Sequence, residues 1–137
     1  MNPVPKPCAV MPLRFVDSVD DVRAFYLDKL AFDSLMGVVG TDGTLDFAIV
    51  QRDGAMLMLS RPEEKGATRG PLSIYVEAQD VDAYHADLIA RGVAIDQPPQ
   101  TQWWGDRTFS IVDAAGDTLV FWQTVAEMNP PPGVKLI

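Results

Sequence analysis

The sequence predicts an α+β fold in which two βαβββ modules form a cupped mixed sheet with a central cleft. Two internal correspondences predict this fold. The stretches 47–59 (FAIVQRDGAMLML) and 109–121 (FSIVDAAGDTLVF) share five residues at a constant spacing of 62 positions. Upstream, 15–30 (FVDSVDDVRAFYLDKL) resembles 75–89 (YVEAQDVDAYHADLI). Each module therefore has a strand and a helix, followed by an apolar hairpin with glycine at its turn.

Periodicity and end signals place the elements in order. Apolar residues at helical spacing, such as Val81, Tyr84 and Leu88, predict amphipathic helices whose apolar side faces a core. Ser18 and Asp80 are suited to cap the two helices, and Gly92 to end the second. The elements expected in the first module are a strand near 9–16, a helix over 19–30, and strands near 33–39, 45–52 and 55–60. Those of the second module are a strand over 72–78, a helix over 81–91, and strands near 94–97, 107–113 and 118–123.

Length and composition indicate one globular domain over residues 1–137. Module 1 spans about 9–60, a polar linker 61–70, module 2 about 71–123 and an extended proline-rich tail 124–137. Apolar residues make up 47% of the chain and charged residues 22%, values typical of a soluble globular protein. Without a membrane-length apolar run or a secretory leader, the expected location is the cytoplasm.

Charge and the scarcity of metal-binding residues exclude several classes of function. The net charge is −8, which disfavours nucleic acid and anionic membranes and favours a cationic small molecule. Cys8 is the only cysteine and His85 the only histidine. One chain therefore forms no internal disulfide, no zinc site with several cysteines and no metal site with two histidines.

Three motifs together resemble a known family. They are Phe25-Tyr26 at the helix entry, Trp104-Gly105-Asp106-Arg107-Thr108-Phe109, and Asp113-Ala114-Ala115-Gly116-Asp117. With the two βαβββ modules, they resemble the glyoxalase/bleomycin-resistance/extradiol-dioxygenase group, the vicinal oxygen chelate superfamily, over roughly 9–123. The family usually has Asp-Pro-Asp-Gly-Asn at the last motif, so this turn lacks the proline.

The resemblance implies four metal-ligand positions, one on each of the first, fourth, fifth and eighth strands. They fall on Met11, Met58, Pro71 or Leu72, and Val120. Divalent metals in this family need carboxylate, imidazole or amide ligands, which none of these side chains supplies. We therefore expect no metal, no other cofactor and no catalytic residue.

What the resemblance then implies is the bleomycin-resistance branch, in which two chains pair and hold a basic drug without altering it. We expect a homodimer that sequesters a cationic or aromatic small molecule, with a role in antibiotic resistance. Aromatic rings provide stacking surfaces, and methionines, Met56 among them, adapt to varied shapes. The candidate ligand-binding residues are Trp103, Trp104, Trp122, Met11, Met58, Val120, Phe47, Phe109 and Arg107.

Alternatives stay open at several of these positions. If Trp103 and Trp104 lie on an extended segment, they point to opposite faces, and only one of them enters the cleft. Arg107 either holds a ligand carboxylate or forms an ion pair with Asp46, whereas His85 is more simply explained as a structural residue. Two other functions compete: an isomerase, lyase or dioxygenase-like enzyme of the same superfamily that uses other side chains, and a non-catalytic interaction module whose cleft is filled by its own residues.

Overall fold

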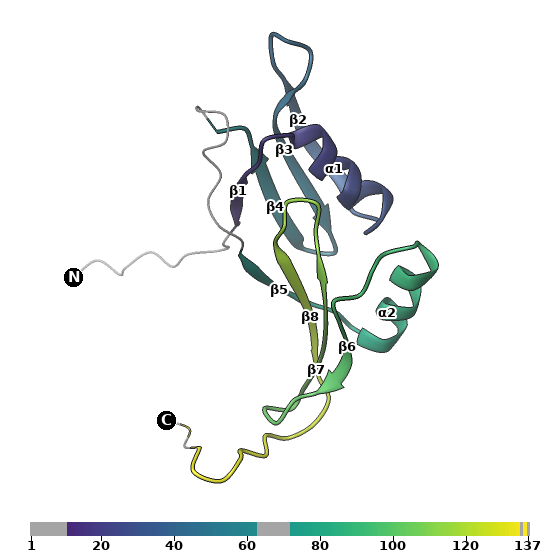
Figure 1. Ribbon diagram of the computed structural model, residues 1–137, viewed down its shortest axis with the longest axis vertical. Coiled ribbons are helices and arrows are strands. Elements are labelled where there is room, and N and C mark those ends of the chain that lie inside the picture. The colour runs from purple at the N-terminus through teal and green to yellow at the C-terminus, as the bar shows by residue number, and fades with distance from the viewer. Residues whose placement is uncertain (1–10, 63–71, 135, 137) are drawn as a thin grey trace, which may run out of the picture. The chain divides into compact units, whose positions relative to one another are not determined.

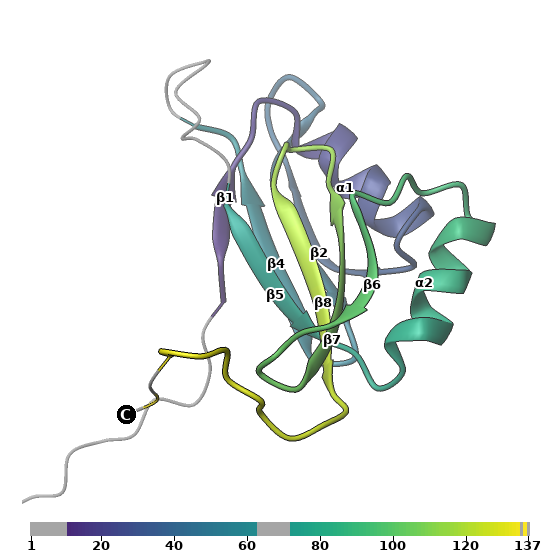
Figure 2. The same ribbon diagram turned by 60° about the horizontal axis from the view of Figure 1, so that its bottom comes forward.

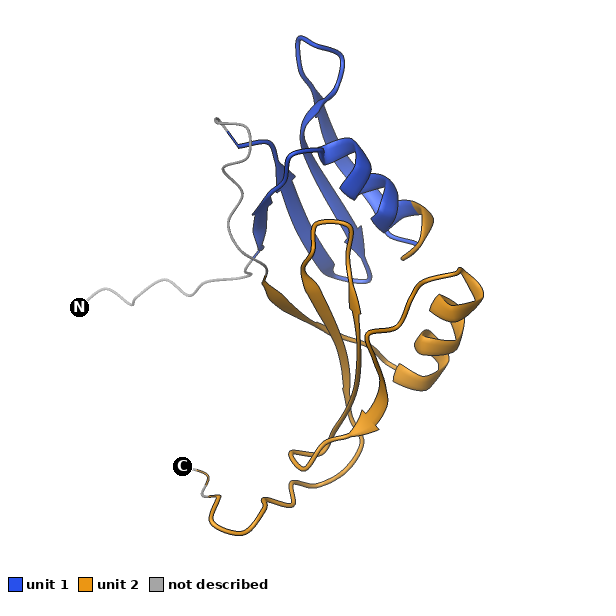
Figure 3. Ribbon diagram, viewed as in Figure 1, with its two compact units in different colours: residues 1–27, 31–68 blue, residues 28–30, 69–137 orange. Residues whose placement is uncertain are grey.

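The structure is a computed structural model, and it describes residues 11–62, 72–134 and 136. It contains two helices and two four-stranded mixed sheets (Figure 1). The chain divides into two compact units, each built on one sheet and one helix (Figure 3). The predicted α+β class and the repeated βαβββ order are both confirmed. In the part of the chain that the structure describes, no helix is long and apolar enough to cross a membrane.

Unit 1 is built from the first five elements. They are β1 (Leu13–Phe15), α1 (Val19–Asp28), β2 (Asp33–Val39), β3 (Leu45–Arg52) and β4 (Ala55–Ser60). The sheet order is β1-β4-β3-β2, with β1 parallel to β4 and the other neighbours antiparallel. At the start of α1, the Ser18 hydroxyl accepts a hydrogen bond from the Asp21 amide at 3.1 Å, as the sequence predicts. A two-residue turn joins β3 to β4, and its Asp53 and Gly54 both have positive φ, as tight hairpins require.

Unit 2 repeats this order. Its elements are β5 (Ser73–Glu77), α2 (Val81–Ala90), β6 (Gln97–Thr101), β7 (Asp106–Val112) and β8 (Thr118–Thr124). The sheet order is β5-β8-β7-β6, and β5 is parallel to β8. Asp80 caps α2 by accepting a hydrogen bond from the Ala83 amide at 3.1 Å, and Gly92 follows the helix with φ of 79°. Both expected end signals are therefore confirmed.

One face of each sheet is packed against the helix of its unit and forms the core. On this face, strand residues alternate with residues that point away, as the two-residue period of a strand requires. The buried apolar strand residues of unit 1 are Ala48, Val50, Leu57 and Leu59, with Val19, Val22 and Tyr26 from α1. The buried apolar strand residues of unit 2 are Phe109, Ile111, Leu119 and Phe121, with Val81 and Leu88 from α2.

Strand β6 lies later in the chain than the sequence predicts. The expected range was 94–97, whereas the strand runs from Gln97 to Thr101 and includes Pro98 and Pro99. Proline usually argues against a strand because it has no amide hydrogen to donate to the ladder. β6 is an edge strand with β7 as its one neighbour, and its register is irregular between Gln97 and Gln100. An edge strand tolerates the two prolines.

Candidate functional site

The face of each sheet opposite the helix is accessible over part of its area, and the pairing register shows which residues lie on it. Directly paired residues point to the same side of a sheet. In unit 1, Leu13 pairs with Met58, Met58 with Ile49, and Ile49 with Met36, so one apolar row crosses all four strands. The neighbouring row is Phe15, Ser60, Phe47 and Val38. We call these eight residues, with Gln51 and Met56, the open face of unit 1.

The open face of unit 1 is apolar and accessible. Leu13 and Phe15 are each 40% exposed, and Met36 on the opposite edge strand is 50% exposed. Met56 and Met58 in the centre of the sheet are half-buried. A surface of this kind offers burial and shape adaptation to a ligand, because methionine side chains are flexible and polarizable.

The open face of unit 2 has a different chemistry. One row consists of Glu77, Trp122, Thr108 and Gln100, and the next of Tyr75, Val120, Ser110 and Gln97. The alternation of β7 and β8 adds Asp106, paired with Thr124, and Val112, paired with Thr118, while Ser73 of β5 pairs with Thr118 from the other side. We call these thirteen residues the open face of unit 2, although Thr108 and Ser110 on its central strand β7 are buried. Aromatic rings, carboxylates and hydrogen-bonding groups replace most of the aliphatic surface of unit 1.

Four of the predicted ligand-binding residues lie on these open faces. Phe47 and Met58 belong to the open face of unit 1, and Val120 and Trp122 to that of unit 2. Met11 is exposed and precedes β1, so it lies beside the sheet edge rather than in the ladder. The same holds for Leu72, which precedes β5 and whose amide donates to the Asp117 carboxylate at 2.8 Å.

Phe109 lies on the opposite side from the one expected for a ligand contact. It is 1% exposed, faces α2 and stacks on Phe121 with ring centroids 5.0 Å apart. The spacing of 62 residues holds for β4 and β8, where Met58 and Val120 are equivalent. The hairpin turn of unit 2 is one residue longer, so the residue equivalent to Phe47 is Thr108. A slip of one residue along a strand exchanges its two faces.

Trp103 and Trp104 lie in the turn between β6 and β7, not on an extended segment. Their rings meet edge to face, with centroids 5.5 Å apart and an interplanar angle of 90°. The expectation that they point to opposite faces of a strand is therefore wrong. The turn is closed by the Gln102 amide, which donates to the Asp106 carbonyl at 2.7 Å. Both rings are half-buried. The turn between β6 and β7 lies at the end of the sheet at which β8 terminates (Figure 2).

The segment after β8 holds this tryptophan turn in place. The Val125 and Ala126 amides donate to the Gly105 carbonyl at 2.9 and 3.1 Å, and the Asn129 amide donates to the Trp103 carbonyl at 2.7 Å. Gly105 has φ of 93°, and a Cβ on it would lie 2.2 Å from the Ala126 carbonyl oxygen. Only glycine allows this close approach of two backbones.

Arg107 and Asp46 are not partners of each other. Arg107 donates from Nε to both Asp82 carboxylate oxygens on α2 at 2.9 Å, and from Nη1 to the Thr101 hydroxyl at 3.2 Å. This side chain lies on the helix face, with Asp82 as its partner in place of the expected Asp46. Asp46 instead accepts from Arg61 Nε at 2.9 Å.

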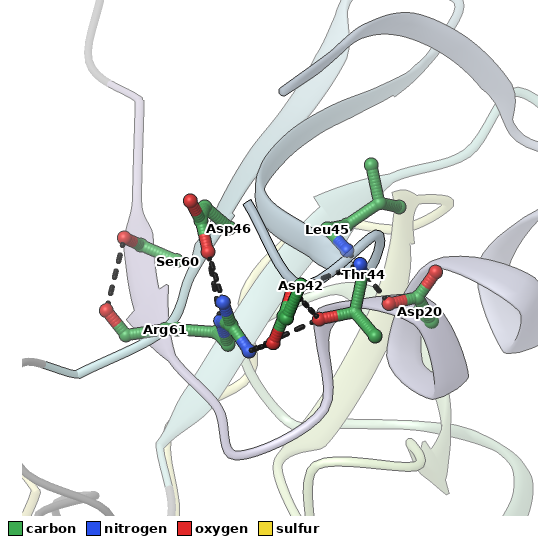
Figure 4. Close-up of polar contacts among 7 residues, drawn as sticks. All are labelled: Asp20, Asp42, Thr44, Leu45, Asp46, Ser60 and Arg61. Carbon is green, nitrogen blue, oxygen red and sulfur yellow. Dashed lines mark hydrogen bonds and ion pairs between the residues drawn. The ribbon is translucent and has the colours of Figure 1, made fainter. Parts of the chain in front are cut away.

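Arg61 links the end of β4 to the loop between β2 and β3 (Figure 4). Its Nη1 donates to the Asp42 carboxylate and to the Thr44 hydroxyl, both at 3.0 Å. The hydrogen bond from the Thr44 amide, with those from Arg61 and the Thr44 hydroxyl, lowers the pKa of Asp42 from 3.8 to about 2. The Leu45 amide is held by Asp20 at 2.9 Å. The cluster is explained by its role in fixing this loop.

The remaining candidate positions supply no recognisable metal centre. Across the described residues, no group of three or more His, Cys, Asp or Glu side chains is placed to hold a metal ion. His85 packs against Phe109 with ring centroids 5.3 Å apart, in agreement with a structural role. Cys8 and Pro71 lie outside the described residues.

The family follows from a direct comparison. The model of the Glyoxalase/Bleomycin resistance protein/Dioxygenase superfamily matches residues 9–121. The chain belongs to this superfamily. A comparison with curated protein sequences finds no match. Because the superfamily includes both enzymes and resistance proteins, membership alone leaves the activity to be argued from the site.

Solved structures with the same fold include a bleomycin-binding protein and a bleomycin resistance determinant. The bleomycin-binding protein of Streptomyces verticillus, solved with copper(II)-bleomycin, is 28% identical with a TM-score of 0.67, covering 90% of this chain and all of the other. TioX from Micromonospora sp. ML1 is 21% identical with a TM-score of 0.73, covering 87% of this chain and 100% of its own. The bleomycin resistance determinant of transposon Tn5 is 21% identical with a TM-score of 0.70, covering 86% and 98%.

Sequence reasoning missed several residues of the open faces. Leu13 and Phe15 on β1, and Tyr75 and Glu77 on β5, were not singled out, although each pair shows the two-residue period of a strand face. That period identifies residues that share a face. It leaves open which face the helix covers, and this depends on the pairing with β4 and β8.

Proposed function

We propose that the protein is a metal-free binding protein that sequesters a small drug of the bleomycin type and thereby contributes to antibiotic resistance. The observation that carries the proposal is the chemistry of the two open faces. Met58 and Val120, at the implied metal-ligand positions of β4 and β8, are apolar; Met58 pairs with Leu13 and Ile49, and Val120 pairs with Tyr75 and Ser110. Such surfaces stabilise a bound aromatic molecule by burial and stacking.

We propose further that the protein acts as a homodimer. Edge strand β2 exposes Leu35, Met36, Val38 and Val39, and Val39 is 66% exposed. Exposed apolar residues concentrated on one unpaired edge are typical of surfaces that another chain covers. Pairing of two chains would remove these side chains from water.

Calorimetric titration tests the binding proposal. The protein is treated with a chelator, dialysed, and titrated with metal-free bleomycin and with copper(II)-bleomycin in parallel. We expect saturable binding of the metal-free drug, and at a free concentration one hundred times its Kd the folded state gains about 2.7 kcal/mol, seen as a higher Tm.

Two results would contradict the proposal. One is the absence of heat and of any Tm change with both forms of the drug. The other is binding or turnover that appears only after Zn²⁺, Ni²⁺, Mn²⁺ or Fe²⁺ is added, which would place the protein with the metal-dependent members of its superfamily.

A further inference from the structure

The open face of unit 2 gathers carboxylates and aromatic rings at one end of the sheet. Glu77 on β5 pairs directly with Trp122 on β8. Neighbouring strands lie about 4.8 Å apart, so the Glu77 carboxylate and the Trp122 indole stand side by side. Tyr75, two residues before Glu77, is diagonal to Trp122 and 64% exposed, and aromatic side chains reach across this diagonal.

The charge on this face is not compensated. Among the thirteen residues of the open face of unit 2, Glu77 and Asp106 are acidic and none is basic. The Glu77 carboxylate makes no ion pair or hydrogen bond with another described residue, whereas the Asp106 carboxylate accepts one from the Thr124 hydroxyl at 2.8 Å. The two described arginines of unit 2 form ion pairs with other residues, Arg107 with Asp82 and Arg91 with Asp87.

We propose that Tyr75, Glu77 and Trp122 form a binding site for an organic ammonium group. An aromatic ring attracts a cation to its π face. An unpaired carboxylate beside it adds Coulombic attraction and so favours a cation over a neutral molecule of the same shape. The inference rests on the proposed function, since it names the chemical group that one part of the ligand presents. Asp106, diagonal to Trp122, adds negative potential to the same end of the face.

The corresponding positions of unit 1 show that this chemistry is not a property of the fold. Leu13 and Phe15 occupy the positions of Tyr75 and Glu77, and Met58 and Ser60 those of Val120 and Trp122. The same pair of strands therefore presents an aliphatic and aromatic surface in one unit and an aromatic–acidic surface in the other. A cationic group therefore matches the open face of unit 2 and not that of unit 1.

Choline and its neutral isostere 3,3-dimethyl-1-butanol test the site directly. They have nearly the same shape, so a difference in affinity reports charge. Binding is followed in NMR titrations at low ionic strength through the backbone amide signals of Tyr75 and Glu77, which every variant retains, and through the Trp122 indole N–H where Trp122 is present. We expect choline to bind more tightly than the alcohol, and Glu77→Gln to weaken choline about three- to fivefold while leaving the alcohol unchanged. Trp122→Leu is expected to weaken choline about fivefold or more.

Asp28→Asn is the matched control, because it removes one negative charge from the exposed end of α1 and leaves the open face of unit 2 intact. It is expected to leave both affinities unchanged. The inference is overturned if Glu77→Gln retains the full preference for choline, if Asp28→Asn reduces it equally, or if choline does not shift the Trp122 signal. Bleomycin binding without choline binding would overturn the inference and keep the proposed function. Choline binding without bleomycin binding would keep the ammonium site and overturn the proposed function.

Discussion

Gly105→Ala is expected to destabilise the protein by about 2 to 4 kcal/mol, although it adds a single methyl group. The added methyl group would lie 2.2 Å from the Ala126 carbonyl oxygen and 3.1 Å from its carbon, both backbone atoms. To relieve the clash, the segment after β8 has to leave the tryptophan turn, which breaks the hydrogen bonds that the Gly105 carbonyl accepts. Urea denaturation measures the loss.

Gly116→Ala is the control for backbone strain alone. Gly116 has φ of 85°, close to that of Gly105, but a Cβ there meets nothing within 4 Å. Its loss is expected to be about 1 kcal/mol. Equal losses for the two variants would contradict the close packing of the final segment on the turn, and so would an unchanged environment of the Trp103 and Trp104 indoles in Gly105→Ala.

Phe109→Ala and Phe47→Ala are expected to differ strongly, although the sequence repeat matches the two residues. Phe109 is buried between Phe121, Tyr84 and His85, so its removal should cost about 3 to 5 kcal/mol of stability. Phe47 is half-buried on the open face of unit 1, and its removal should cost about 1 to 2 kcal/mol.

Binding should respond in the opposite order. Phe47→Ala removes apolar surface from an open face and is expected to weaken bleomycin binding in the calorimetric titration. Phe109→Ala, measured where the variant is folded, is expected to bind with nearly unchanged affinity. Comparable stability losses for both variants would contradict the one-residue difference between the hairpin turns.

The repeat made most of the fold predictable. Strands β2, β3 and β4 have the predicted bounds, because apolar alternation flanked by turn residues is a local signal. The caps Ser18 and Asp80 are also local, since each side chain satisfies an amide three residues ahead. These features depend on neighbours in sequence, which is why the sequence alone identifies them.

Features that depend on distant partners were harder to predict. β6 was placed too early because Pro98 and Pro99 disfavour a strand unless it lies at a sheet edge, and the edge is a property of the whole sheet. Phe109 was assigned to the wrong face because one inserted turn residue reverses the alternation downstream. The partner of Arg107 is on α2, twenty-five positions away along the chain, where sequence spacing gives no guide.

The sequence predicted the residue types of the candidate site better than it predicted which residues lie side by side there. Met58, Val120 and Trp122 were found through the superfamily resemblance and lie on open faces. Glu77 and Tyr75 were not found. A carboxylate and a phenol on a strand are typical of solvated residues, and only the strand register shows that Trp122 lies beside them. The acidic character of the whole chain pointed to a cationic ligand without locating it.

NMR mapping of the drug on chelator-treated protein tests the central claim that the open faces bind a ligand without metal. Methionine methyl groups provide probes at Met36, Met56 and Met58 on one open face, and the Trp122 indole provides one on the other. Saturation with metal-free bleomycin is predicted to shift these signals and to leave those of the buried Leu88 and Val19 methyl groups in place. Shifts confined to the helix side of the sheets, or shifts that require an added divalent metal, would contradict the account.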